Sequence, residues 1–63
     1  MDDKVVLKSY ENKYEANIDH RRLAENKIES WIIDKKDSAY VMIGDIELYV
    51  DAENFEKAKE IID

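Results

Sequence analysis

Two lysines, a carboxylate and two hydroxyl groups lie close together in the middle of the 63-residue chain. They are Lys35, Lys36, Asp37, Ser38 and Tyr40. Adjacent ammonium groups attract an anion, so this cluster is a candidate site for an anionic metabolite or a nucleotide. The alternative is an ordinary turn, in which short polar side chains bond their own backbone and Tyr40 packs. The glycine-rich loops that cradle phosphate groups are absent, because the chain has a single glycine.

Aromatic residues outside this cluster provide a second candidate surface. Strand-like alternation directs Tyr49 away from the expected core, and Val6 and Lys8 are its expected neighbours. Trp31 and Tyr10 are further candidates, although the pattern around Trp31 does not settle which face it occupies. Exposed aromatic side chains on one sheet face suggest a surface for a protein partner. The alternative is that scattered surface aromatics need no explanation.

Three consecutive basic or titratable residues, His20, Arg21 and Arg22, form a third candidate, for an anion or an acidic partner. We expect the two arginines to lie near the start of the second helix, beside Asp51 and Glu53. Ordinary surface ion pairs, which contribute little to stability, are therefore the favoured interpretation. His20 shares a helix face with apolar residues, and we expect it to be partly buried by packing.

The chain shows no catalytic or metal-binding motif. It contains one histidine and no cysteine, which excludes two-histidine and thiolate metal motifs. The serines lack a nucleophile motif, and the carboxylates lie on expected solvated helix faces. We therefore expect no enzymatic activity, no catalytic residue, no metal and no cofactor.

Five elements in the order β-α-β-β-α are predicted to position the candidate residues. Apolar alternation predicts strands over 5–8, 30–33 and 46–50, and helical spacing predicts a helix over 13–26 and a second one after residue 51. Asn12, with Glu15 three residues later, matches a capping box at the first helix, and Asp51 is expected to cap the second. Asn26 is expected to end the first helix in a left-handed conformation.

The strand periodicity also predicts the layers. Ile46, Leu48 and Val50 should point inward, and the second helix presents a stripe formed by Phe55, Ala58, Ile61 and Ile62. We expect a single domain over 1–63 that folds as a two-layer α+β sandwich, with a three-stranded antiparallel sheet and both helices on one face. The third strand should lie between the other two, as in a ferredoxin-like plan without its last strand. One sheet face and the edge of the first strand then remain uncovered, for an unknown protein partner or for self-association.

The charge and hydropathy exclude some partners. The net charge is -6, and residues 45–63 carry seven acids but only two bases. Phosphate backbones require clustered lysine and arginine, so we expect no nucleic-acid partner. No run of about 18 apolar residues is present, so we expect no membrane partner. The acidic first residues do not resemble a secretory signal, and a cytoplasmic location is expected.

Several segments resemble a known family. They are residues 12–16 with Leu23 and Ile28, then 37–40, 44–50 and 56–61. Together they resemble a small bacterial domain family of unknown function, named as a prokaryotic signal transducing protein and grouped with GlnB-like, ferredoxin-like folds. The resemblance implies a non-enzymatic signal-transducing or protein-interaction module. In GlnB-like proteins the connection between strands 2 and 3 carries effector contacts, so the alternative is a small-molecule sensor that uses the cluster at 35–40. The family often has glycine where Lys27 stands and proline where Asp51 stands.

Overall fold

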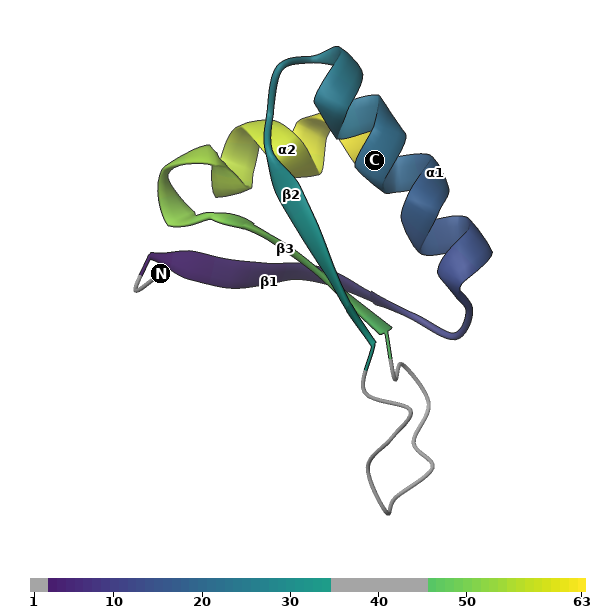
Figure 1. Ribbon diagram of the computed structural model, residues 1–63. Coiled ribbons are helices and arrows are strands. Elements are labelled where there is room, and N and C mark those ends of the chain that lie inside the picture. The colour runs from purple at the N-terminus through teal and green to yellow at the C-terminus, as the bar shows by residue number, and fades with distance from the viewer. Residues whose placement is uncertain (1–2, 35–45) are drawn as a thin grey trace.

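The computed structural model describes residues 3–34 and 46–63. In this part of the chain three strands and two helices follow the predicted order β-α-β-β-α (Figure 1). The elements are β1 (Lys4–Tyr10), α1 (Lys13–Glu25), β2 (Ser30–Asp34), β3 (Ile46–Asp51), a 3-10 turn η1 (Ala52–Asn54) and α2 (Phe55–Ile62). The first strand is longer than the apolar residues alone indicated, because it continues to Tyr10.

The three strands form one antiparallel sheet in the order β1-β3-β2. The prediction that the third strand lies in the centre is therefore confirmed. The alternation in β3 is also confirmed, because Ile46, Leu48 and Val50 are completely buried while Glu47 and Tyr49 are only half-buried. A central strand with one fully buried face fixes the register of its two neighbours.

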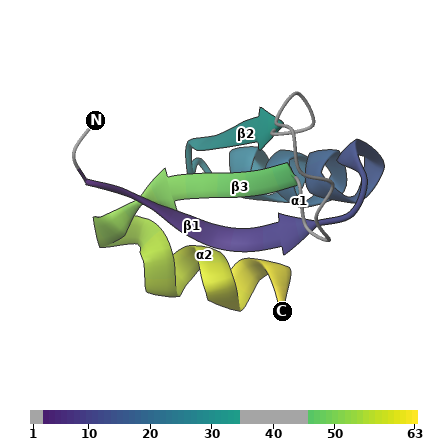
Figure 2. The ribbon, with the colours of Figure 1, turned by 90° about the horizontal axis from the view of Figure 1, so that it is seen from below.

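Both helices cover the same face of the sheet (Figures 1 and 2). α1 packs against β2, α2 and β3, and α2 packs against α1, β1 and β3. Between the helices and the sheet lies a single core, formed by Tyr10, Ala16, Leu23, Ile28, Ile46, Leu48, Val50, Ala58 and Ile62. The predicted two-layer α+β arrangement is therefore confirmed, and the other sheet face carries no helix of the described chain.

The start of α1 follows the local sequence signal. The Asn12 side-chain Oδ1 accepts a hydrogen bond from the backbone N–H of Glu15 at 2.9 Å. This bond satisfies one of the N–H groups that a helix start leaves without an intrahelical partner. The predicted N-cap is confirmed.

The end of α1 differs from the prediction by one residue. Lys27, and not Asn26, has the left-handed conformation, with φ values of 65° and -100° respectively. The backbone N–H of Lys27 donates to the carbonyl of Ala24, and that of Ile28 donates to the carbonyl of Leu23. These two bonds form a Schellman motif, in which the residue after the C-cap must be left-handed. Lys27 therefore occupies a position that favours glycine.

The start of α2 also differs from the prediction. Asp51 makes no side-chain capping bond, and the 3-10 turn η1 precedes the helix. The Asp51 carboxylate lies instead 3.9 Å from the Nζ of Lys4 on the neighbouring strand. The predicted apolar stripe is confirmed, because Ala58 and Ile62 are buried and Phe55 packs against the core.

β1 contains a β-bulge that the sequence pattern did not reveal. Val5 pairs with Val50 and Val6 with Tyr49, but Lys8 pairs with Leu48. Leu7 therefore has no partner of its own in β3, and the strand shifts by one residue at this point.

Candidate functional site

The sheet face opposite the helices carries an aromatic and aliphatic cluster, which we call the open face: Lys4, Val6, Trp31, Ile33 and Tyr49. Val6 on β1 and Trp31 on β2 both pair with Tyr49 on the central strand. Val6 and Ile33 keep 39% and 43% of their surface exposed. The strands thus place a continuous row of large side chains across the whole sheet.

A shallow hollow of about 420 Å³ lies on the open face, lined by Lys4, Trp31, Ile33 and Tyr49. The Lys4 ammonium lies 4.2 Å from the centre of the Trp31 ring, within the range of a cation–π contact. The Tyr49 hydroxyl donates to the Glu47 carboxylate at 2.9 Å. The centre of the hollow is therefore apolar and its polar groups are held at the rim, an arrangement suited to apolar side chains of a partner.

Three of the four residues predicted for partner binding come together on this face. Val6, Trp31 and Tyr49 share it, and the undecided orientation of Trp31 is resolved by its pairing with Tyr49. The expectation that Lys8 neighbours Tyr49 is wrong, because the bulge places Lys8 opposite Leu48, which faces the core. The Lys8 Nζ lies 5.5 Å from the ring of Tyr10.

The five residues of the predicted ligand cluster, Lys35, Lys36, Asp37, Ser38 and Tyr40, lie outside the described residues. The structure does describe the position directly before them. The Asp34 carboxylate at the end of β2 lies 3.2 Å from the Nζ of Lys13 in the first turn of α1. The end of β2 therefore lies beside the start of α1, as the predicted topology required.

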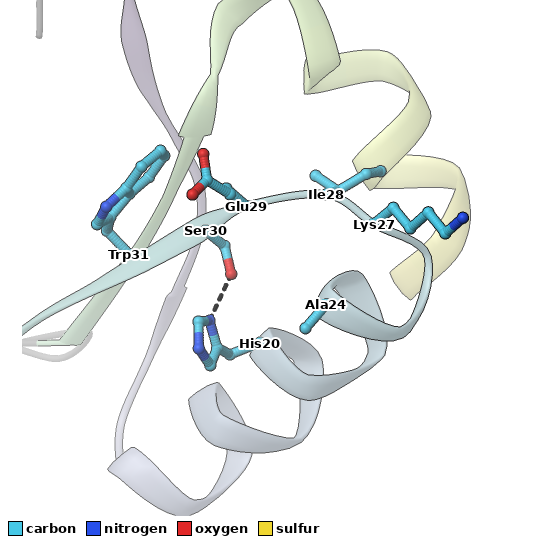
Figure 3. Close-up of a pocket in the computed structure, with 7 residues that line it drawn as sticks. All are labelled: His20, Ala24, Lys27, Ile28, Glu29, Ser30 and Trp31. Atoms are coloured by element: carbon cyan, nitrogen blue, oxygen red, sulfur yellow. Dashed lines mark hydrogen bonds between the residues drawn. The ribbon is translucent and has the colours of Figure 1, made fainter.

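A second hollow, of about 350 Å³, lies between the end of α1 and the start of β2 (Figure 3). The Ser30 side chain points toward α1 and its hydroxyl forms a hydrogen bond with Nδ1 of His20. Trp31 and Glu29, which also line the hollow, project to the other side of the strand (Figure 3). Ser30 is 8% exposed, so its hydroxyl orients the imidazole instead of facing a substrate.

A buried hydrogen bond joins β1 to α1. The Tyr10 hydroxyl donates to Oδ2 of Asp19 at 2.6 Å, and both residues are buried. The expectation that Tyr10 belongs to the exposed aromatic surface is therefore wrong. Burial raises the pKa of the Tyr10 phenol, and the nearby Asp19 carboxylate raises it further. Sequence reasoning missed this pair, although Asp19 falls between Ala16 and Leu23 on the buried stripe of α1, where a carboxylate needs a partner.

Arg22 extends this network to α2. Its guanidinium lies 4.0 Å from Oδ1 of Asp19 and donates to the backbone carbonyl of Ile61 at 3.1 Å. The expected proximity of Arg22 to Asp51 and Glu53 is therefore wrong, because α1 runs past the end of α2 and not its start. One polar chain consequently ties β1, α1 and α2 together.

Over residues 3–34 and 46–63, no helix is long and apolar enough to cross a membrane. The same residues contain no group of three or more histidine, aspartate or glutamate side chains that could hold a metal ion.

No family model matches the chain, and neither a curated protein nor a solved structure matches it. The open face is therefore the feature from which a function can be argued.

Proposed function

We propose that the chain is a non-enzymatic protein-interaction or signal-transducing module that binds its partner on the open face. One observation carries the proposal: within residues 3–34 and 46–63 helices cover the sheet on one side only, and the other side presents Trp31, Tyr49, Val6 and Ile33 around a hollow. Contiguous exposed apolar groups with a polar rim are typical of interaction sites. Tryptophan and tyrosine supply much of the binding energy at such sites.

The dimensions of the open face favour a single helix of the partner as the occupant. Three strands spaced about 4.8 Å apart give a face roughly 10–14 Å wide, close to the diameter of one helix with its side chains. The strands are five to seven residues long. A face of this size falls short of the roughly 800 Å² per partner of a standard interface, so we expect weak, reversible binding of an amphipathic helix.

The fold is consistent with a signalling role of this kind. The element order and the strand order β1-β3-β2 are those expected for the proposed ferredoxin-like, GlnB-like plan without its last strand. The resemblance to the prokaryotic signal transducing protein family remains part of this proposal. The interaction role itself is proposed from the open face.

Capture from native lysate on the immobilised chain tests the proposal, with two matched variants. Tyr49→Ala removes the ring at the centre of the open face, whereas Tyr14→Ala removes a ring that is 75% exposed on α1. We expect a partner that is retained by the wild type and Tyr14→Ala and lost by Tyr49→Ala, with circular dichroism confirming that both variants fold.

The helical segment of the captured partner is then titrated against the fluorescence of Trp31. This is the only tryptophan of the chain, and it lies on the open face. We expect a saturable change in emission. Equal capture by the Tyr49→Ala variant, or unchanged Trp31 emission at saturation, would refute the proposal.

A second candidate function is a sensor of an anionic metabolite or nucleotide that uses Lys35, Lys36 and Ser38. The observation that favours it is the Lys13–Asp34 contact, which places the start of α1 beside the residue that precedes the cluster. Helix starts attract anions, and two neighbouring lysines add to that attraction. A thermal-shift screen with nucleotides and carboxylates tests it. Stabilisation that is unchanged in the Lys35→Ala/Lys36→Ala variant would exclude this site.

A further inference from the structure

The two outer strands of the sheet differ in how their free edges are protected. In the described sheet, β1 and β2 each pair with β3 on one side only. Natural sheets block such edges with bulges, lysines or prolines, because an unblocked edge pairs with another chain. β1 has two of these devices: the bulge at Leu7 and the lysines Lys4 and Lys8.

The edge of β2 has none of these devices. Its sequence is Ser-Trp-Ile-Ile-Asp, and all five residues pair with β3 in an uninterrupted register. The single charge, on Asp34, lies at the end of the strand against Lys13. A regular, β-branched edge without a lysine or a bulge is the kind that accepts an additional strand.

The surroundings of β2 leave room for such a strand. The hollow beside Ser30 lies at the start of β2, and Ala24 and His20 of α1 also line it (Figure 3). Side chains of an added strand would alternate between this hollow and the open face beside Trp31.

We propose that the added strand is β2 of a second copy of this chain, paired antiparallel across a two-fold axis. In the fully overlapped register Ile32 faces its own counterpart, and Trp31 faces Ile33 of the other copy. An aromatic side chain opposite a β-branched one is a favourable cross-strand pair. The edge is therefore complementary to itself, as an isologous interface requires.

The charge distribution favours a second copy as the occupant. α2 lies beneath β1, at the opposite edge of the sheet from β2 (Figure 2), and residues 51–63, which include this helix, carry five acids and two bases. α1, which lies beside β2, carries three acids and three bases. Pairing through β2 thus brings together the less charged edges and keeps residues 51–63 of the two copies apart, which limits their repulsion.

This inference goes beyond the proposed function and stands independently of it. Pairing at β2 joins two open faces into one six-stranded face and leaves Tyr49 on each central strand uncovered. A monomer could still bind a partner helix, and the pair could form without any partner.

Sedimentation equilibrium of the wild-type chain is the first test. Because a five-residue edge makes a small interface, we expect a dissociation constant between about 10 µM and about 1 mM. The mass should rise from 7.5 kDa toward twice that value as the concentration increases. The Tyr49→Ala variant should associate as the wild type does, which separates this test from that of the open face. A wild-type chain that stays monomeric at about 1 mM would overturn the inference.

Single-cysteine variants test the register, because the chain has no cysteine of its own. Mild oxidation should link Ile32→Cys to itself, since paired strand residues have Cα atoms about 4.5–5.5 Å apart. The Ile33→Cys variant alone should not form a disulfide, because the Cα atoms of residue 33 in the two copies would lie about 8 Å apart. It should form one when mixed with the Trp31→Cys variant, because residues 31 and 33 of the two copies face each other. The mixture reports the same register if Ile32→Cys fails to fold. Linkage through the control Val6→Cys on β1, instead of through β2, would overturn the inference.

Discussion

Replacing Tyr10 by phenylalanine should weaken the fold through one deleted hydroxyl group. That hydroxyl donates to Asp19 at 2.6 Å, and the two residues are only 4% and 8% exposed. A hydrogen bond to a charged group contributes about 1.5–3 kcal/mol, and a buried carboxylate that loses its donor bears the full desolvation cost. Arg22 remains 4.0 Å from the other carboxylate oxygen, so we expect a loss of about 2 kcal/mol in the free energy of unfolding.

Urea unfolding followed by circular dichroism, together with thermal melting, measures this loss. In a domain of this size about 1 kcal/mol corresponds to roughly 4–8 °C, so the melting temperature should fall by about 8–16 °C. The matched control is Tyr14→Phe, which removes a hydroxyl from a side chain that is 75% exposed and should change the free energy by less than about 0.5 kcal/mol. If the Tyr10→Phe variant lost no more than this control, the bond between β1 and α1 would not contribute as argued.

Three further predictions concern the same fold. Because its surroundings raise the pKa of Tyr10 above the ordinary value of about 10, the protonated phenol favours the folded state. Stability should therefore fall as the pH rises above about 10, and urea titrations should show a smaller fall in Tyr10→Phe. Lys27→Gly should gain about 0.5–1 kcal/mol, because it relieves a left-handed residue at the end of α1, whereas Asn26→Gly, at a φ of -100°, should show no gain in thermal melts. Asn12→Ala should cost about 1 kcal/mol in urea unfolding, because Glu15 loses its capping bond.

Features set by neighbours in the sequence could be predicted, and those set by distant contacts could not. The Asn12 cap spans three residues, and the alternation in β3 is visible in Ile46, Leu48 and Val50. The left-handed residue at the end of α1 was predicted at Asn26 and lies at Lys27. Asparagine was favoured because it tolerates the left-handed region better than lysine does. Tertiary hydrogen bonding to the last turn of the helix overrode that preference.

The candidate site shows the same division. The grouping of Trp31, Val6 and Tyr49 follows from strand order and alternation, although the face of Trp31 required the observed register. Lys8 was misplaced because a bulge leaves almost no trace in a short apolar run. Its only hint is that three apolar residues, Val5 to Leu7, follow one another where alternation would place a polar one.

Because of the bulge at Leu7, the number of residues in β1 decides which face of the sheet each side chain occupies. Val5 and Tyr10 are five residues apart, and in a regular strand they would point to opposite faces. The bulge residue Leu7 occupies one of these five steps and has no partner in β3. Val5 and Tyr10 therefore both point toward the helices, and the Tyr10 hydroxyl can reach Asp19. Loss of the single codon for Leu7 would remove the bulge but leave Val5 opposite Val50 and Tyr10 opposite Ile46, so the phenol would still point toward Asp19. In mutational terms, a deletion at this site preserves the facing of β1, whereas the same deletion in a regular strand reverses the facing of every residue beyond it.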